Sequence, residues 1–273
     1  MPPHKFISSL QNPEIRRLQH WNQKSRDRRK DGRFVLEGLR EFRLALSGGY
    51  RTDALYYCPD ILSDGEAREL ADRSDAPLTG LSREVYAHLA YRGKTEGLIA
   101  VIQARDHSLA SLELPNPEPL VLVAEAPEKP GNLGALLRTA DAAGLDAVLV
   151  ADLKGDLYNP NTIRSSLGCL FTVPVAVADS ATLIAFLRER RIRILAAALG
   201  GSLRYDRADY TPATAIAVGT EATGLTPAWT DAADARVEIP MAGQIDSMNV
   251  SVAAAVLIFE ARRQRGFVPD VEK

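Results

Sequence analysis

Cysteine and histidine are scarce in this chain of 273 residues, and their scarcity excludes several kinds of site. The two cysteines, Cys58 and Cys169, lie far apart, so we expect neither a disulfide framework nor a CxxC metal site. The four histidines are His4, His20, His88 and His107. A Ser/His/Asp triad or a histidine metal site therefore cannot be built from the C-terminal part alone, and we expect no metal there.

Long hydrophobic runs are also missing. No run approaches the roughly eighteen apolar residues of a membrane span, and the first residues lack the apolar core of a signal peptide. We therefore expect a cytoplasmic protein with no membrane attachment. The motifs GxxxxGK[ST] and GxGxxG are absent as well, so a nucleoside triphosphatase or a nicotinamide-dependent dehydrogenase would lack its usual signature.

Positive charge is concentrated near the N-terminus, although the whole chain has a net charge of −2. Residues 16–43 contain ten basic side chains against four acidic ones. Such a run is often only a solvated surface, but this one leads directly into a compact α/β pattern, which favours contacts with phosphates. The candidates for such phosphate contacts are Arg26, Arg28, Arg29, Lys30 and Arg33.

Alternating strand and helix patterns predict two domains. Residues 1–105 read as a small α/β domain, and the polar segment 106–118, which contains Pro115 and Pro117, reads as a linker. Residues 119–273 repeat apolar strands and helices, which predicts a mostly parallel sheet buried on both faces. Ligands are then expected at the carboxyl ends of the strands.

The stretch 237–264 joins a short strand, a polar loop and a helix that is apolar on almost every face from Val250 to Ala261. A helix of this kind is expected to be buried all round. The polar loop before it then lies at the edge of a core, with Ser247 and Asn249 at the start of the helix, where free backbone N–H groups can meet a ligand.

Several polar residues at the expected strand ends have simple structural explanations when each is taken alone. Asn132 is a natural N-cap, and Asp141 is a natural partner for Arg138. Glu221 and Ser247 are suited to a turn and a helix cap. Their joint occurrence at three expected strand ends favours a site instead.

The stretches PGNLGALLRTADAAG, AVGTEATGL and IPMAGQIDSMNVSVA closely resemble, in order and spacing, the three motifs of the SpoU (TrmH-like) branch of the SPOUT class of RNA ribose 2′-O-methyltransferases. The resemblance covers the chain from about Leu120 to the end. The N-terminal module, with RRKDGRFVLEGLRE, is similar to the substrate-binding domain of this family, which resembles ribosomal proteins that bind kink-turns. Met248 stands where the family commonly has Leu, a swap of similar volume that should be tolerated.

The resemblance implies an α/β fold with a deep trefoil knot in the C-terminal SPOUT domain, S-adenosylmethionine as cofactor, and a homodimer. The catalytic residues it implies are Arg138, Asn132, Glu221, Ser247 and Asn249. The cofactor-binding residues it implies are Gly219, Ile239, Met248, Met241 and Ala198. Arg164 is a weaker candidate for a substrate phosphate. Because a guanidinium keeps its proton in proteins, we interpret Arg138 as a cation that stabilises the developing alkoxide.

The expected reaction is therefore methyl transfer to a ribose 2′-hydroxyl, with ribosomal RNA as the favoured substrate. Alternatives of the same fold are methylation of a transfer RNA ribose or of a base nitrogen. A non-catalytic RNA-binding protein and a generic nucleotide-binding α/β enzyme are the remaining readings. The presence of all the motif residues disfavours the former, and the missing phosphate loop disfavours the latter.

Overall fold

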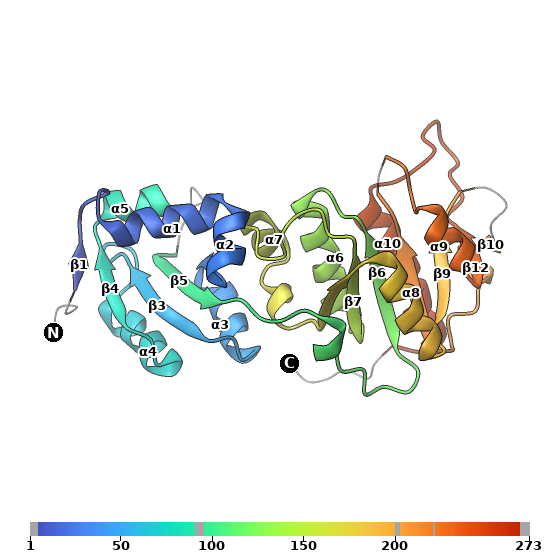
Figure 1. Ribbon diagram of the computed structural model, residues 1–273, viewed down its shortest axis with the longest axis horizontal. Coiled ribbons are helices and arrows are strands. Elements are labelled where there is room, and N and C mark those ends of the chain that lie inside the picture. The colour runs from blue at the N-terminus through green and yellow to red at the C-terminus, as the bar shows by residue number, and fades with distance from the viewer. Residues whose placement is uncertain (1–4, 91–95, 200–202, 221, 268–273) are drawn as a thin grey trace. The chain divides into compact units, whose positions relative to one another are not determined.

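The computed structural model describes residues 5–90, 96–199, 203–220 and 222–267 (Figure 1). The chain divides into two compact units. Unit 1 comprises Met1–Asp106 and Asp156–Thr172, and unit 2 comprises His107–Gly155 and Val173–Lys273. Within the described ranges, no helix combines the length and hydrophobicity that a membrane span requires.

Unit 1 is built on a mixed five-stranded sheet with the order β1-β4-β3-β5-β2. Its strands are β1 (Phe6–Ile7), β2 (Arg33–Glu37), β3 (Thr52–Tyr57), β4 (Leu78–Leu81) and β5 (Leu98–Gln103). Strand β5 runs antiparallel to both β2 and β3, while β4 runs parallel to β1 and β3. The α/β character predicted for the N-terminal part is confirmed.

The helices of unit 1 follow the expected local signals. They are α1 (Pro13–Gln23), α2 (Ser25–Asp31), α3 (Leu39–Ser47), α4 (Asp64–Ser74), α5 (Arg83–Leu89) and α7 (Pro160–Ser165), with a short 3₁₀ turn at Cys169–Phe171. Helix α1 begins where the Asn12 side chain accepts a hydrogen bond from the Glu14 amide, with Pro13 as its first residue. Its buried face, formed by Ile15, Leu18 and Trp21, packs into the core against the sheet.

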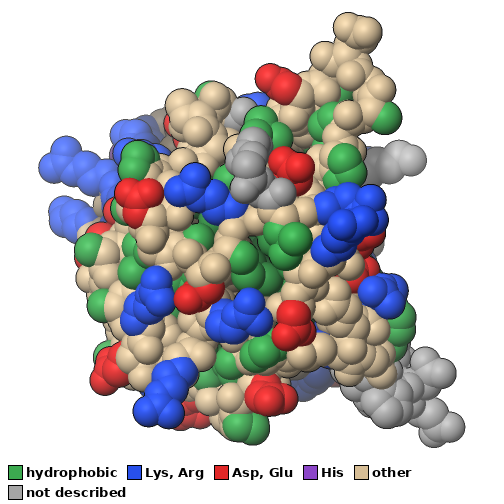
Figure 2. Space-filling model, turned by 90° about the vertical axis from the view of Figure 1, so that its right-hand side faces the viewer, with side chains coloured by type: hydrophobic (Ala, Val, Ile, Leu, Met, Phe, Trp, Pro, Cys, Tyr) green, Lys and Arg blue, Asp and Glu red, His purple; other side chains and the backbone are tan. Residues whose placement is uncertain are grey.

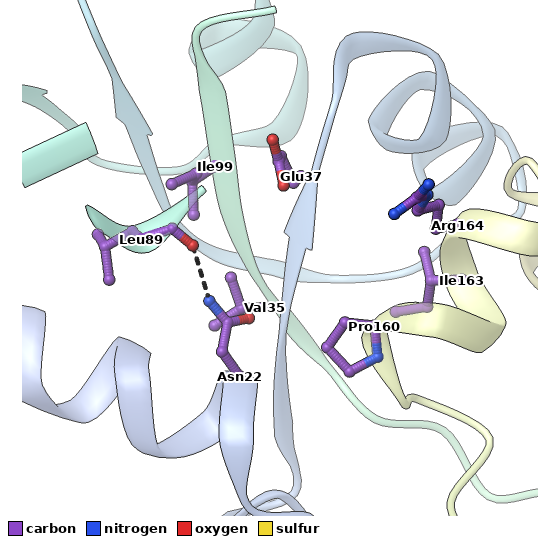
Figure 3. A pocket seen from close by; sticks show the side chains of 8 residues that line it. All are labelled: Asn22, Val35, Glu37, Leu89, Ile99, Pro160, Ile163 and Arg164. Atoms are coloured by element: carbon purple, nitrogen blue, oxygen red, sulfur yellow. Dashed lines mark hydrogen bonds between the residues drawn. The ribbon is translucent and has the colours of Figure 1, made fainter. Parts of the chain in front are cut away.

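The segment 156–172 lies in the C-terminal half of the sequence but belongs to unit 1 by its contacts. The ring of Phe34 stacks on Tyr158 with centroids 4.2 Å apart, and Phe171 stacks near it at 5.9 Å. Figure 3 shows how Pro160 and Ile163 of α7 line a small pocket together with Val35 of β2. The sequence-based division at 106–118 did not anticipate this excursion of the chain.

A buried ion pair fixes the beginning of the same segment. Arg28 Nε donates to Asp156 Oδ2 at 2.6 Å, and the two side chains are only 4% and 7% exposed. The Arg28 Nη1 atom also donates to the backbone oxygens of Trp21 and Asn22. Arg28 is therefore a structural residue of unit 1, and its predicted role in RNA binding is corrected: its guanidinium does not reach solvent.

Unit 2 contains a seven-stranded sheet with the order β10-β12-β9-β11-β6-β7-β8. Its strands are β6 (Leu120–Glu125), β7 (Ala147–Ala151), β8 (Val175–Ala178), β9 (Arg193–Ala197), β10 (Leu203–Arg204), β11 (Thr214–Val218) and β12 (Ala235–Glu238). Every pair of neighbouring strands is parallel, which confirms the predicted parallel sheet. The strand order reverses beside β6, so a crevice is expected at the carboxyl ends of β6 and β11.

Helices cover both faces of this sheet. They are α6 (Pro130–Ala143), α8 (Ser180–Glu189), α9 (Pro227–Ala232) and α10 (Val250–Arg265), with 3₁₀ turns at Leu109–Ser111 and Tyr205–Arg207. Leu183 and Leu187 of α8 and Trp229 of α9 form one core with side chains from β6, β7, β9 and β11. Because side chains alternate along a strand, the other face of the sheet is left for α6 and α10, which pack on each other.

Helix α10 is not buried all round, contrary to the expectation from its composition. Ala254, Leu257, Ile258 and Ala261 are fully buried, but Val252 is 50% exposed and Phe259 is 43% exposed. These two residues lie seven positions apart and so share one side of the helix. The apolar composition of α10 therefore serves an internal face and an outward apolar stripe, defined here as Val252, Val256 and Phe259.

Candidate active site

The larger cavity of unit 2 lies where β9, β11 and β12 end and α10 begins. It has a volume of about 490 Å³. All five residues predicted to bind the cofactor line it, namely Ala198, Gly219, Ile239, Met241 and Met248. Ser247 also lines it, on the exposed loop between β12 and α10 that projects from the body of unit 2 (Figure 1). The strand ends thus gather these residues as the parallel sheet predicts.

A smaller cavity of about 310 Å³ lies beside the carboxyl end of β6 and the start of α6. Glu125, Lys129, Asn132 and Leu136 contribute to its wall. The two cavities share a wall formed by the end of β11 and the first residue of α10, with Val218, Gly219, Thr220, Ala222 and Val250 lining both. Two molecules bound in the two cavities would therefore be separated from each other only by this wall.

Gly219 is required by its own loop. A Cβ atom at this position would lie 2.1 Å from the backbone carbon and oxygen of Gly224 and 2.3 Å from the Leu225 nitrogen. The loop folds back because Thr220 and Gly224 exchange backbone hydrogen bonds of 3.1 and 3.0 Å, with Gly224 in the left-handed region at a φ of +67°. The groups that approach Gly219 closely are thus backbone atoms of its own loop, at Gly224 and Leu225.

Glu125 is a site residue that the motifs did not identify. It is only 3% exposed and ends β6 at the smaller cavity. Its Oε2 accepts a hydrogen bond from the Thr226 amide at 2.8 Å, and its Oε1 accepts one from the Thr226 hydroxyl at 2.6 Å. A lone carboxylate in the apolar run PLVLVAEA was the available signal, because buried carboxylates need hydrogen-bonding partners.

Asn132 and Asn249 meet across 117 positions of sequence, where Asn249 Nδ2 donates to Asn132 Oδ1 at 3.2 Å. Helix α6 begins at Pro130 with Lys129 as its N-cap, so Asn132 lies inside the first turn and the simple N-cap explanation for it is wrong. Asn249 is the N-cap of α10, since its side chain accepts from the Ser251 amide at 3.0 Å. Two of the predicted catalytic residues are thereby brought together.

The remaining predicted catalytic residues are not gathered in the same way. Arg138 is exposed on α6, lines neither cavity, and within the described ranges has no hydrogen bond or ion pair, so the simple Arg138–Asp141 pair is not formed. Ser247 Oγ donates to Asp246 Oδ1 at 3.3 Å on the exposed loop. Glu221 lies outside the described residues.

The candidate RNA-binding residues all lie in unit 1. Arg26, Arg29 and Lys30 are exposed on α2. Arg33 is one third exposed and pairs with Asp53, so its charge is partly neutralised. Arg164 is exposed on α7, beside the pocket shown in Figure 3, and therefore belongs with unit 1 rather than with the two cavities.

The described histidine of unit 2 and the possible metal ligands lie outside the two cavities or apart from one another. His107 belongs to unit 2 by its contacts, but its Nδ1 lies 3.0 Å from the Val175 backbone oxygen and it lines neither cavity. Across the part of the chain that the structure describes, no three His, Cys, Asp or Glu side chains are grouped as metal ligands. The polar side chains at the two cavities are amides, hydroxyls and carboxylates, together with the cations Lys129 and Arg236.

Comparison with known proteins identifies the family. The model of the SpoU rRNA Methylase family matches residues 119–259, more than half of the chain. The chain belongs to this family. The model of the MRM3-like substrate binding domain matches residues 12–100, within unit 1. The family predicted from the three motifs is confirmed.

Similar proteins share the whole architecture. A 23S rRNA (guanosine(2553)-2′-O)-methyltransferase of Bacillus subtilis (strain 168) is 30% identical over 94% of this chain and 99% of its own length. A crystal structure of an RNA 2′-O ribose methyltransferase is 39% identical, covers 95% of this chain and 99% of that one, and superposes with a TM-score of 0.83. The AdoMet-bound rRNA methyltransferase from Sinorhizobium meliloti is 27% identical over 95% and 97% of the two chains, with a TM-score of 0.87. The predicted fold class is confirmed at the level of an α/β SPOUT domain with an N-terminal substrate-binding domain.

Proposed function

We propose that this protein transfers a methyl group from S-adenosylmethionine to a ribose 2′-hydroxyl of ribosomal RNA. The observation that carries the proposal is the larger cavity, whose lining contains all five predicted cofactor residues. It shares a wall with the smaller cavity, which is lined by Asn132, the hydrogen-bonding partner of Asn249. The Bacillus subtilis relative, which matches over nearly the full length of both chains, is a ribosomal RNA ribose methyltransferase by name. Such RNA chemistry is consistent with a cytoplasmic location.

The larger cavity fits the cofactor in size and lining. Its volume of about 490 Å³ lies in the ordinary range for small-molecule sites, roughly 300–1,000 Å³. Ile239, Met241 and Met248 supply apolar walls, and the backbone at Gly219 supplies hydrogen-bonding groups. When bound, S-adenosylmethionine supplies a methyl group on a sulfonium. The trefoil knot that the family resemblance implies would be formed by the same loops.

The smaller cavity is suited to the ribose that receives the methyl group. The amides of Asn132 and Asn249 would hold the 2′-hydroxyl by hydrogen bonds, and Ser247 and Glu221 would complete the site from the adjoining loops. Methyl transfer is an in-line displacement, so these residues act chiefly by aligning the reacting atoms. Glu125, through its two bonds to Thr226, holds the end of β6 against the loop that follows β11 and so fixes the wall of this cavity.

Arg138 supplies the positive charge that the reaction needs. Its guanidinium stays protonated and would stabilise the oxygen of the ribose as its proton leaves. In a single chain it lies on the exposed side of α6, outside both cavities. We therefore expect Arg138 to reach a ribose only in an assembly with RNA or with a second copy of the chain.

A homodimer accounts for the outward side of α10. The apolar stripe of Val252, Val256 and Phe259 would be covered by a second subunit, as an exposed apolar surface commonly is. Phe259→Glu should convert the dimer to monomers in sedimentation, whereas Leu203→Glu should not, although Leu203 is equally exposed at 43% on β10. If the wild-type protein sediments only as a monomer at micromolar concentration, the proposed homodimer is wrong.

Arg26, Arg29 and Lys30 on α2 are the proposed phosphate contacts, with Arg33 and Arg164 as further candidates. Figure 2 shows a face of unit 2 on which basic, acidic and hydrophobic side chains are interspersed, whereas α2 brings three exposed cations close together. Replacing Arg26, Arg29 and Lys30 together by Gln should weaken RNA binding and flatten its dependence on salt. Unchanged affinity in this variant would refute the assignment.

The function itself is tested by methylation of ribosomal RNA from cells that lack the protein, followed by mapping of the modified atom. We expect a 2′-O-methyl ribose, and we expect Arg138→Ala to abolish it while cofactor affinity stays close to wild type. Arg190→Ala, which removes an exposed arginine beside Phe186, is the matched control and should remain active. A methyl group on a base nitrogen, or none at all, would overturn the proposal.

A further inference from the structure

A cleft in unit 1 has no part in the proposed methyl transfer. It is formed by α1, the end of α2, β2 and β3, and has a volume of about 460 Å³. Its lining residues are Arg17, Trp21, Asp31, Arg33 and Asp53. The cleft therefore combines two guanidinium groups and two carboxylates around the edge of an indole ring.

Half of these charged groups are already paired with each other. Arg33 Nε donates to Asp53 Oδ2, and Gln103 Nε2 donates to Asp53 Oδ1 at 2.6 Å. Arg33 Nη1 donates in addition to the backbone oxygen of Gly32 at 3.0 Å. Both carboxylate oxygens of Asp53 are thus occupied, and the Arg33–Asp53 pair forms a fixed, nearly neutral wall.

The other two charged groups are open to a ligand. Asp31 Oδ2 accepts a hydrogen bond from Trp21 Nε1 at 2.8 Å, which fixes the orientation of the carboxylate. Within the described ranges, Asp31 Oδ1 and the Arg17 guanidinium make no hydrogen bond or ion pair, and both residues are exposed. The cleft therefore offers a rigid acceptor and a cationic donor group to the same incoming molecule.

This combination is poorly suited to a phosphate, because Asp31 would repel the anion. It matches a nucleobase that presents donors and acceptors on adjacent edges. Guanine offers O6 and N7 as acceptors, which an arginine can bind with two hydrogen bonds, and its N1–H and N2 amino group are donors for a carboxylate. Adenine has an acceptor at N1, which would face the carboxylate unfavourably.

We propose that this cleft binds a guanine base of single-stranded RNA, with Arg17 on O6 and N7 and Asp31 on N1 and N2. Specific RNA readers commonly bind unstacked bases in this way. The exposed Arg26 and Arg29 on the neighbouring helix α2 would contact the flanking phosphates. The inference rests on the proposed function, because it assumes that the protein binds RNA, and it assigns to unit 1 a base-specific contact separate from the methylated nucleotide.

The test uses the full chain and short oligouridine RNAs that carry one central guanosine, 7-deazaguanosine or inosine, with binding followed by fluorescence anisotropy at one salt concentration. 7-Deazaguanosine lacks the N7 acceptor and inosine lacks the N2 amino group. We expect the wild type to bind the guanosine RNA roughly 5- to 150-fold more tightly than oligouridine. Either modified base should lose much of this preference.

The variants assign each atom to its residue. Arg17→Ala should bind guanosine and 7-deazaguanosine RNAs equally, and Asp31→Asn should bind guanosine and inosine RNAs equally. Arg40→Ala removes an exposed charge from α3 of the same unit and should weaken all the RNAs alike while keeping the guanosine preference. The modified bases test the wild type directly, so the result does not depend on the folding of any variant.

Equal affinity of the wild type for the guanosine and uridine RNAs, including undetectable binding of both, would overturn the proposal. So would a preference for guanosine that persists when N7 and N2 are removed. Methylation of ribosomal RNA is measured separately on the same preparation. Active methylation without a guanosine preference would therefore reject the base-binding cleft alone and leave the proposed function standing.

Discussion

Breaking the buried ion pair between Arg28 and Asp156 should strongly destabilise unit 1. The two side chains are only 4% and 7% exposed, so both charges are almost completely removed from water. Removing one partner of such a pair leaves the other charge buried and unpaired, which costs about 3–5 kcal/mol. Arg28→Ala also removes the donor from the backbone oxygens of Trp21 and Asn22, so we place it at the upper end of this range.

Urea unfolding followed by fluorescence measures the effect. The chain has two tryptophans, Trp21 in unit 1 and Trp229 in unit 2, so a Trp229→Phe background makes the signal report on unit 1. In this background Arg28→Ala and Asp156→Ala should each lower the free energy of unfolding by about 3–5 kcal/mol. The double variant should lose much less than the sum, because the two residues interact directly.

Arg29→Ala is the matched control, since Arg29 is the exposed neighbour of Arg28 on α2. It should change the free energy of unfolding by no more than about 0.5 kcal/mol. If Arg28→Ala proved no more destabilising than Arg29→Ala, the conclusion that segment 156–172 is held in unit 1 by this pair would be wrong. Arg28 would then again be a candidate for phosphate binding.

Two further predictions concern the candidate active site. Gly219→Ala should lower the free energy of unfolding by about 1–3 kcal/mol and weaken cofactor binding, because its Cβ would overlap the backbone of Gly224; Gly243→Ala, where a Cβ meets nothing within 4 Å, should behave as wild type in the same denaturation and calorimetry. Asn249→Ala should lower the free energy of unfolding by about 1 kcal/mol, because the cap of α10 is lost. It should lower the rate of methylation more than it lowers cofactor affinity. Equal losses of rate and affinity would argue against a place for Asn249 beside the ribose.

The sequence predicted the cofactor-binding residues best, because they lie in three short motifs. The three polar stretches follow apolar strands, and parallel strands bring their carboxyl ends to one edge, so Gly219, Ile239 and Met248 were correctly expected to lie near each other. The Asn132–Asn249 contact follows from the same topology. Arg138 shows the limit of this argument, because its position on α6 turns its side chain away from the cavities of its own chain.

Other features depend on contacts that no local pattern contains. Arg28 looks like its exposed neighbours in a basic run, and only its partner Asp156, 128 positions away, makes it structural. The segment 156–172 carries only a short helix and a 3₁₀ turn between two strands of unit 2, yet its aromatic rings pack on Phe34. For α10, hydrophobicity alone does not distinguish residues that are buried in the core from residues of the exposed apolar stripe.

Crystallography of the protein with S-adenosylmethionine tests the central claim most directly. We predict that the cofactor lies in the larger cavity, in contact with the backbone at Gly219 and Ile239 and with Met241 and Met248, and that its methyl group points toward the wall shared with the smaller cavity. A cofactor bound at any other place, or a methyl group directed away from Asn132 and Asn249, would contradict the account.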